Sequence, residues 1–248
     1  MRIRNILISL STTLFLLGLW QLICVLSLVP EFILPTPVAV IHAFIDDFPL
    51  IFENAKTSMT ETLLGLIVSI LLAYFTVIVM DRFLFLESVL LPIITFTQTI
   101  PTIAIAPLLV LWMGFGITPK VVLIIIVCYF PLVMGLLSGF KAVGKEYKIL
   151  SDSLQLSSLK VLFSIKIRGT FKEFFVGLKI AISYAVVGAI IAEWLGGESG
   201  LGVYMMRVRK AYAYDKMFAV IFLVSALSLV LLAVVKVIEK VVLRYENK

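Results

Sequence analysis

Hydrogen-bonding side chains lie inside an apolar, uncharged stretch of this sequence, where they could contact a polar solute. They are Thr95, Gln98 and Thr99, and two prolines, Pro101 and Pro107, follow them. Polar residues within a membrane-spanning helix usually face the helix bundle or a water-filled cavity rather than lipid. Proline residues there either kink the helix or shape the wall of a cavity. The pattern therefore indicates a broken helix whose polar face lines a pathway, with a simple kink as the alternative.

Glu193, near the end of a later apolar stretch, is a second candidate group. Its carboxylate either lines the outer end of the same pathway, caps a helix or pairs with an outer arginine. A basic cluster follows at Arg207, Arg209 and Lys210. This cluster faces either solvent and lipid headgroups or the acidic surface of a partner. The sequence leaves these alternatives open.

Metal and nucleotide chemistry have little support in the sequence. The single histidine, His42, has no surrounding carboxylates, and Cys24 and Cys128 fall in apolar stretches where a small buried side chain is the ordinary role. The chain has no phosphate-binding loop of the G-x-x-x-x-G-K-S/T kind. We therefore expect no metal and no cofactor in this chain, and no ATP hydrolysis by that route. The net charge of +6 reflects basic loops and does not indicate nucleic acid.

The elements that must position these groups are membrane helices. The 248 residues are 62% hydrophobic and only 15% charged, against about 45–50% and roughly 25% in globular domains. A membrane helix needs ~20 mostly apolar residues. We therefore predict an all-α integral membrane protein with about six transmembrane helices. The apolar stretches are at 6–29, 62–80, 88–112, 121–140, 174–195 and 217–235.

The orientation follows from the basic residues. Lys and Arg concentrate in the loops on the side that carries both termini, which places both termini in the cytoplasm. The first apolar stretch is longer than the core of a signal peptide and no small-x-small cleavage site follows it, so we expect a retained anchor. An aqueous turn is expected on the outer side at 114–120, ending in Lys120.

Two loop segments have helical patterns. In the outer segment 30–58, apolar residues recur at helical spacing after Thr36 as a cap and Pro37 in the first turn. In the inner loop 141–172, the stretch 145–154 has an apolar face formed by Tyr147, Leu150 and Leu154. A break is expected at residues 155–156, with Ser157 as the cap of a second helix. The inner helix either lies on the membrane surface or fills the groove of a partner.

Several motifs, in order, resemble the permease subunits of ATP-binding-cassette (ABC) importers of the nitrate, sulfonate and taurine type, including a branch for thiamine-related pyrimidine precursors. The resemblance covers roughly residues 30–235. The matching positions are 33–37, Pro101, Pro107, Trp112, Gly114, Gly116, Pro119, Lys120, Phe130, Pro131, 177–181, 192–197 and 200–202. The inner-loop motif departs from the family at two places: Gln155 stands where the family has glycine, and Arg168 where it has proline.

The resemblance implies a type I ABC importer permease (MetI-like) fold and a non-catalytic subunit in a bacterial inner membrane. It implies a second copy of the chain, cytoplasmic ABC ATPase subunits that bind the ATP, and an extracytoplasmic substrate-binding protein as partners. The residues that it places at the ATPase are Glu146, Leu150, Ser151, Leu154, Gln155 and Ser157. The solute would be a sulfonate, nitrate, taurine or a thiamine-related pyrimidine.

The expected organisation is a first transmembrane helix at 1–29, an outer amphipathic segment at 30–58 and a permease core at 59–248, with the coupling loop at 141–172. A secondary transporter is the alternative function. Such proteins usually carry ionisable residues within the membrane and two repeated halves. The apolar stretches here are nearly free of Asp and Glu, and the sequence has no duplicated half.

Overall fold

The computed structural model describes residues 2–153 and 158–245, and every regular element in these ranges is a helix. The elements are α1 (Arg2–Val25), α2 (Pro37–Asp46), α3 (Phe48–Arg82), α4 (Leu84–Thr99), α5 (Thr102–Met113), α6 (Ile117–Ser153), α7 (Ser158–Val161), the π-helix η1 (Leu162–Lys166), α8 (Ile167–Gly169), α9 (Phe171–Gly196), α10 (Leu201–Lys210), α11 (Tyr214–Val242) and a final 3-10 turn, η2 (Leu243–Tyr245).

The membrane-spanning elements are those that the apolar stretches predicted. Helices α3, α6, α9 and α11 are each long and apolar enough to cross a bilayer, and α4 with α5 forms a bent pair that passes the same test. The described apolar part of α1, Leu10–Val25, is shorter, within a helix of 24 residues. Among the described residues, four helices, or five elements with the bent pair, are therefore long and apolar enough to span a bilayer, and α1 and α2 are shorter apolar helices. The prediction of an all-α integral membrane protein is confirmed, with fewer full-length spans than the six that we expected.

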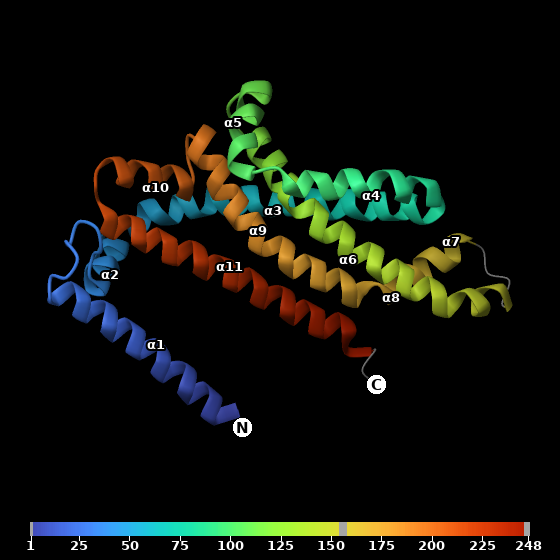
Figure 1. Cartoon of the computed structure of the whole chain (residues 1–248), viewed down its shortest axis with the longest axis horizontal. Coiled ribbons are helices and arrows are strands. Elements are labelled where there is room, and N and C mark those ends of the chain that lie inside the picture. Colours follow the sequence, from blue (N-terminus) through green and yellow to red (C-terminus); the bar gives the residue numbers. More distant parts are fainter. Residues whose placement is uncertain (1, 154–157, 246–248) are drawn as a thin grey trace.

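The core of the fold is the packing of α6 against α9 and α3, which run side by side along the length of the molecule (Figure 1). The backbones of α6 and α9 approach closely because glycine lies in the contact. A Cβ atom added at Gly177 would lie 2.5 Å from the carbonyl oxygen of Pro131. Small residues at helix contacts are the usual means of close packing in membranes. The close approach at Gly177 and Pro131 therefore fixes how α9 packs against α6.

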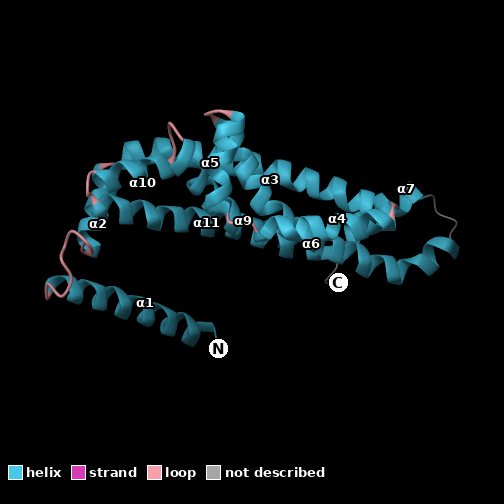
Figure 2. Ribbon diagram, turned by 45° about the horizontal axis from the view of Figure 1, so that its top comes forward, coloured by secondary structure: helices cyan, strands magenta, loops and turns pink. Residues whose placement is uncertain are grey.

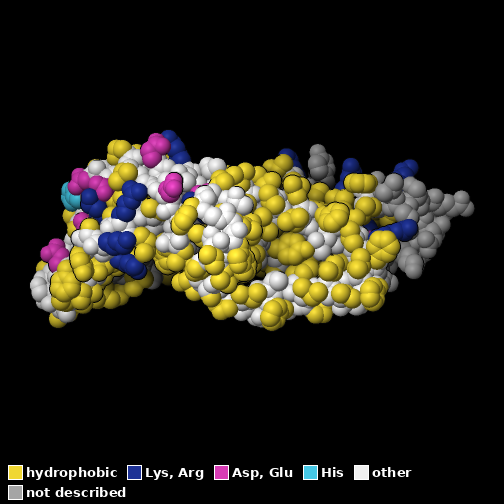
Figure 3. Space-filling view, turned by 90° about the horizontal axis from the view of Figure 1, so that it is seen from above, with side chains coloured by type: hydrophobic (Ala, Val, Ile, Leu, Met, Phe, Trp, Pro, Cys, Tyr) yellow, Lys and Arg dark blue, Asp and Glu magenta, His cyan; other side chains and the backbone are white. Residues whose placement is uncertain are grey.

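Charged side chains gather at the two ends of the molecule and leave an apolar middle (Figure 3). Acidic and basic side chains mix at the end that carries α2 and α10, and basic side chains dominate the visible part of the other end. An apolar band between two polar ends is what a bilayer requires of a spanning protein.

Helix α1 stands away from the other spans for much of its length (Figure 2). Its contact with the body is near its C-terminal end, where the ring of Trp20 lies 6.1 Å from that of Phe218 and 5.8 Å from that of Phe222. The apolar side chains of α1 are otherwise mostly exposed.

The outer segment folds as its caps predicted, over a shorter range. The Thr36 hydroxyl accepts a hydrogen bond from the Ala39 backbone N–H at 3.1 Å, and Pro37 occupies the first turn of α2. Helix α2 ends at Asp46, and α3 begins at Phe48, within the range 30–58 that we assigned to the outer surface. Pro49 in the first turn of α3 suits this start, since its missing N–H would be unpaired there anyway.

Candidate functional site

The polar stretch around Thr95 folds into two helices whose directions differ by 100°, so the chain forms a broken helix here and the alternative of a simple kink does not hold. Pro101 causes the break, because it has no N–H to continue α4 and it restricts the residue before it. Ile100 and Pro101 are both extended, with ψ angles of 124° and 115°. Helix α5 then starts as the N–H groups of Ala104 and Ile105 donate to the Pro101 carbonyl. Pro107 lies inside α5.

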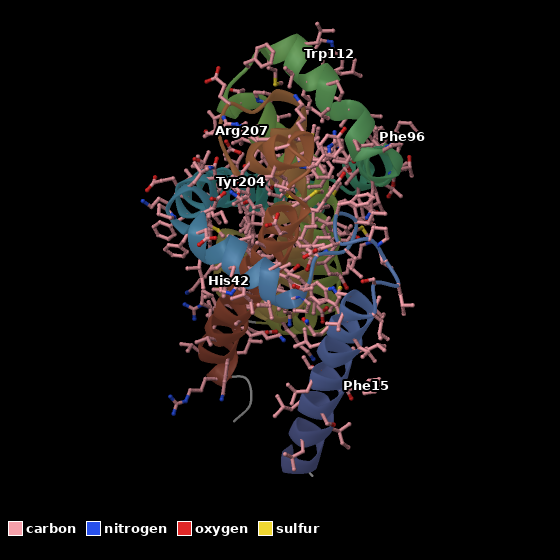
Figure 4. All side chains as sticks on the ribbon, turned by 90° about the vertical axis from the view of Figure 1, so that its left-hand side faces the viewer. Phe15, His42, Phe96, Trp112, Tyr204 and Arg207 are labelled. Atoms are coloured by element: carbon pink, nitrogen blue, oxygen red, sulfur yellow. The ribbon has the colours of Figure 1, made fainter. Side chains whose placement is uncertain are left out.

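One face of α4 forms the wall of an open cleft of about 660 Å³. The cleft contains two of the predicted residues, Thr95 and Thr99, and both are exposed. The full lining is Glu87, Ser88, Leu91, Pro92, Thr95, Phe96 and Thr99. Phe96 points outward from α4 in the end-on view (Figure 4). A span with hydroxyl groups on an exposed face indicates a wet surface rather than a lipid-facing one.

Gln98 lies on a different side of α4. It lines a smaller pocket of about 170 Å³ with Thr97, Ile100 and Thr102, and this pocket is closed by Ile126 and Val127 of α6 and Tyr184 of α9. The structure therefore divides the predicted polar residues between two pockets: a cleft along α4 that contains Thr95 and Thr99, and a smaller pocket at the α4–α5 break that contains Gln98.

Glu193 lines neither of these pockets and is only 1% exposed. Its carboxylate accepts hydrogen bonds from the Ser58 hydroxyl at 2.6 Å and from the Gly202 N–H at 2.5 Å. The described contacts of Glu193 include no arginine. Through these buried hydrogen bonds, Glu193 of α9 contacts both α3 and the start of α10.

A buried ion pair beside Glu193 was missed by sequence reasoning. Lys120 donates to Glu61 at 2.5 Å, and the two side chains are 5% and 3% exposed. The expectation that Lys120 lies in an aqueous turn is therefore wrong. The available signal was a carboxylate and an ammonium group at the edges of apolar stretches, where ionisable residues usually pair with one another.

The polar side chains around this ion pair hold the loop between α9 and α10 in place. The N–H of Gly200 donates to Asn54 at 2.8 Å, and the N–H of Leu201 donates to Ser58 at 2.8 Å. Gly200 has a φ of +119° and lies against the Glu193 carboxyl, where a Cβ atom would clash at 2.3 Å. The glycine-rich stretch after α9 is thus a tight turn that these hydrogen bonds hold in place.

A second cluster, named the outer cluster after the orientation that the sequence predicts, joins helix ends at the end of the molecule that carries α2 and α10. Asp47, between α2 and α3, accepts from Lys216 at 2.9 Å and from the Tyr204 hydroxyl at 2.7 Å. The hydrogen bond from Lys216, followed by that from Tyr204, lowers the pKa of Asp47 below its ordinary value. Burial, followed by the hydrogen bond to Asp47, raises the pKa of Tyr204. The cluster ties α10 and α11 to the start of α3.

Acid is expected to weaken this outer cluster. A carboxyl with a lowered folded-state pKa stabilises the fold above its unfolded pKa of about 3.9, and that stabilisation is lost as the pH falls toward the folded value. We expect the melting temperature of the detergent-purified protein to fall as the pH is lowered below about 4. The Asp47→Asn variant should have a lower melting temperature than wild type at pH 7, and its melting temperature should fall less when the pH is lowered. The control variant Asp46→Asn changes an exposed neighbour and should melt as wild type does at both pH values. Identical acid curves for Asp47→Asn and wild type would contradict this role.

Three of the predicted ATPase-contact residues lie on α6 at the opposite end of the molecule. Glu146, Leu150 and Ser151 belong to the last turns of α6, which continues without interruption from the span to Ser153, and their side chains lie outside the described part. Leu154, Gln155 and Ser157 lie outside the described residues.

The return from this segment to α9 is anchored to α3. Lys166, at the end of η1, donates to both carboxylate oxygens of Asp81 at 2.6 Å. Because Asp81 is in the last turn of α3, this pair joins the segment that precedes α9 to the C-terminal end of a span.

Comparison with known proteins agrees with this architecture. Residues 65–244 match the model of the family described as binding-protein-dependent transport system inner membrane component. A probable ABC transporter permease protein of Haemophilus influenzae is 32% identical over 216 residues, which are 87% of this chain and 88% of that protein. The formylaminopyrimidine transport permease protein of Halalkalibacterium halodurans is 30% identical over 244 residues, 97% of each chain.

More distant relatives extend the comparison. The taurine transport system permease protein of Escherichia coli is 27% identical and covers 92% of this chain and 86% of its own length. Among solved structures, a crystal structure of an amino acid ABC transporter with histidines superposes with a TM-score of 0.62 at 15% identity, over 82% of this chain and 96% of that one. That likeness concerns the fold and supports the MetI-like arrangement.

The family match covers most of the chain, including the broken pair, the buried ion pair's Lys120 and the loop held by Glu193. The relatives are named as permease proteins, which supports a non-catalytic role in transport. The chain is a multi-pass membrane protein that belongs to the family of binding-protein-dependent transport system inner membrane components, the permeases of ABC importers.

Proposed function

We propose that two copies of this chain form the membrane pathway of an importer for a small solute, with energy from a separate ATPase that binds the ATP. The observation that carries this proposal is the exposed polar face of α4, at Thr95 and Thr99, within the uncharged stretch 88–119. In a single chain this face has no covering helix among the described elements, and a polar surface at membrane depth needs water or protein beside it.

The pathway in this proposal runs along the α4–α5 break. Thr95 and Thr99 line its wider part and Gln98 its narrower side pocket, while Pro101 and Pro107 shape the broken wall. Glu193 acts at the outer end through the loop that it holds, since the carboxylate itself is buried in the single chain.

The partners in this proposal follow from the two ends of the molecule. The inner loop 141–172, with Glu146, Leu150, Ser151, Leu154, Gln155 and Ser157, receives the cytoplasmic ATPase, and both termini are cytoplasmic. A substrate-binding protein delivers the solute at the end that carries α2 and α10. The first helix at 1–29 and the segment 30–58 precede the permease core at 59–248.

The solute in this proposal belongs to the set that includes sulfonates, nitrate, taurine and thiamine-related pyrimidines. Two relatives support this range by their names, one for formylaminopyrimidine and one for taurine. The first of these aligns with nearly the whole of both chains.

Reconstitution tests the proposal against a secondary transporter. The ion pair Glu61–Lys120 and the buried Glu193 are intramembrane ionisable groups of the kind that ion-coupled transporters use. Purified protein in proteoliposomes should hydrolyse no ATP alone, and should take up solute only when its ATPase, its binding protein and ATP are added. ATP hydrolysis by the single chain, or uptake driven by an ion gradient without the ATPase, would contradict the proposal.

A further inference from the structure

Three ionisable side chains lie buried together where α3, α6 and α9 meet. Glu61, Lys120 and Glu193 are 2%, 4% and 1% exposed. Lys120 supplies one positive charge, so two ionised carboxyl groups would leave the cluster with one uncompensated negative charge. Burial of an unpaired charge is strongly unfavourable, and a group in this position usually becomes neutral instead. The cluster therefore needs one more positive charge.

Other basic side chains on the surrounding helices do not supply this charge. Lys56 of α3 and Lys216 of α11 each pair with a carboxyl group outside the cluster. Arg207 of α10 is exposed and donates to a backbone carbonyl. Within the part of the chain that the structure describes, no basic side chain except that of Lys120 interacts with the two buried carboxyl groups.

The hydrogen-bond donors around the two carboxyl groups leave one oxygen atom without a partner. Oε1 of Glu61 accepts from Lys120 at 2.5 Å. The two oxygens of Glu193 accept from the Ser58 hydroxyl at 2.6 Å and from the Gly202 N–H at 2.5 Å. Oε2 of Glu61 is buried and has no donor among the described residues, although the Glu193 carboxyl lies within hydrogen-bonding reach of Glu61. Since a carboxylate only accepts, two carboxyl groups can bond to each other only if one of them carries a proton.

A proton satisfies the charge and the unpaired oxygen at once, whereas a metal ion or a water molecule does not. A hard cation such as Ca²⁺ or Mg²⁺ takes about six or more oxygen ligands. Here the Ser58 hydroxyl, the Gly202 N–H and the Lys120 ammonium group already point their hydrogens at the carboxyl oxygens. A water molecule could donate to Oε2 of Glu61 but would leave the negative charge uncompensated.

We propose that Glu61 and Glu193 form a proton-binding site, in which the two carboxyl groups share one proton and form a neutral buried cluster with Lys120. The proton completes the attachment of the loop between α9 and α10 to α3, because Glu193 holds the start of α10 through the Gly202 N–H. The site is part of the fold, so the inference requires neither the pathway along α4 nor a particular solute.

Infrared spectroscopy of the purified protein in detergent tests the site, because a protonated carboxyl group and a carboxylate absorb at different frequencies. At pH 7 the wild type should show a protonated carboxyl band that shifts when glutamate is isotope-labelled. The band should be lost in Glu61→Gln and in Glu193→Gln, since the remaining carboxylate then balances Lys120. The matched control is Glu53→Gln, which changes an exposed carboxylate of the same helix and should keep the band. A wild type without the band, or a band that survives in either buried variant, would overturn the proposal.

Thermal and denaturant unfolding give an independent readout. Between about pH 6 and about pH 9, ordinary carboxyl and lysine side chains do not titrate. A folded state that holds one proton, which the unfolded chain releases, loses stability as the pH rises, by up to about tenfold in the folding constant per pH unit. Wild type and Glu53→Gln should show this loss, and Glu193→Gln should show little of it. The double variant Glu61→Gln with Glu193→Gln should be less stable than either single variant, because Lys120 then has no counter-charge. Equal pH dependence in wild type and Glu193→Gln would overturn the shared proton.

Discussion

Replacing both Leu150 and Leu154 by aspartate is expected to abolish co-purification of the ATPase while the membrane fold remains intact. These residues form the apolar face predicted for the stretch 145–154 of an otherwise polar inner loop. Burial of one leucine side chain contributes ~1.5–3 kcal/mol. Loss of two such anchors therefore weakens docking by about two to four orders of magnitude. Affinity purification of the complex from detergent measures the effect directly.

The matched control replaces the same two leucines by methionine, which keeps the apolar volume and should retain the ATPase. Gln155→Gly should also be tolerated, because it introduces the residue that the family has at this turn. Normal ATPase binding and transport by the double aspartate variant would mean that the helix merely lies on the bilayer. The coupling assignment would then be wrong.

The described structure gives this segment a direct connection to the pathway. Helix α6 is continuous from Ile117 to Ser153, so its inner end and the wall of the smaller pocket, at Ile126 and Val127, belong to one helix. The contact between α6 and α9 at Gly177 makes independent movement of the two helices difficult. A displacement at the ATPase is thus expected to reach the α4–α5 break through α6 and α9 together.

The substitution Lys120→Met is expected to destabilise the protein strongly, and more than Asp47→Asn does. Removing one partner of a buried ion pair costs about 3–5 kcal/mol, because it leaves the other charge uncompensated. The remaining Glu61 would have little access to water, since it is 2% exposed and its Oε2 atom has no hydrogen-bond partner. Glu193, a second carboxyl group within hydrogen-bonding reach, would offer no positive charge. Thermal unfolding and the yield of monodisperse protein in detergent measure the loss.

A double variant provides the control for this prediction. Glu61→Gln combined with Lys120→Met removes both charges and keeps similar volumes, and replacing a buried ion pair by neutral groups is often close to neutral for stability. We expect the double variant to recover most of the melting temperature lost by Lys120→Met. A double variant no more stable than the single one would show that Lys120 acts mainly through another group, such as the Ser199 carbonyl, which lies 3.4 Å away.

The apolar stretches alone determined the class of the fold. Only helices and closed barrels can span a bilayer, so uncharged stretches of about 20 residues are expected to form membrane-spanning helices. The start of α2 could also be predicted from the sequence, because Thr36 is a typical N-cap residue and Pro37 suits the first turn. The polar residues Thr95, Gln98 and Thr99 were found because a hydroxyl or amide group is conspicuous within an uncharged stretch.

Only the tertiary structure decided which distant groups meet. Lys120 and Glu61 are 59 positions apart, and Ser58 and Glu193 are 135 apart, so no local pattern could pair them. The 100° break is a similar case: Pro101 removes a hydrogen bond and permits a bend, but packing against α3, α6 and α9 selects its angle. Sequence thus determined which segments enter the membrane, since that depends on the polarity of each segment, whereas the arrangement of polar groups depended on contacts between segments.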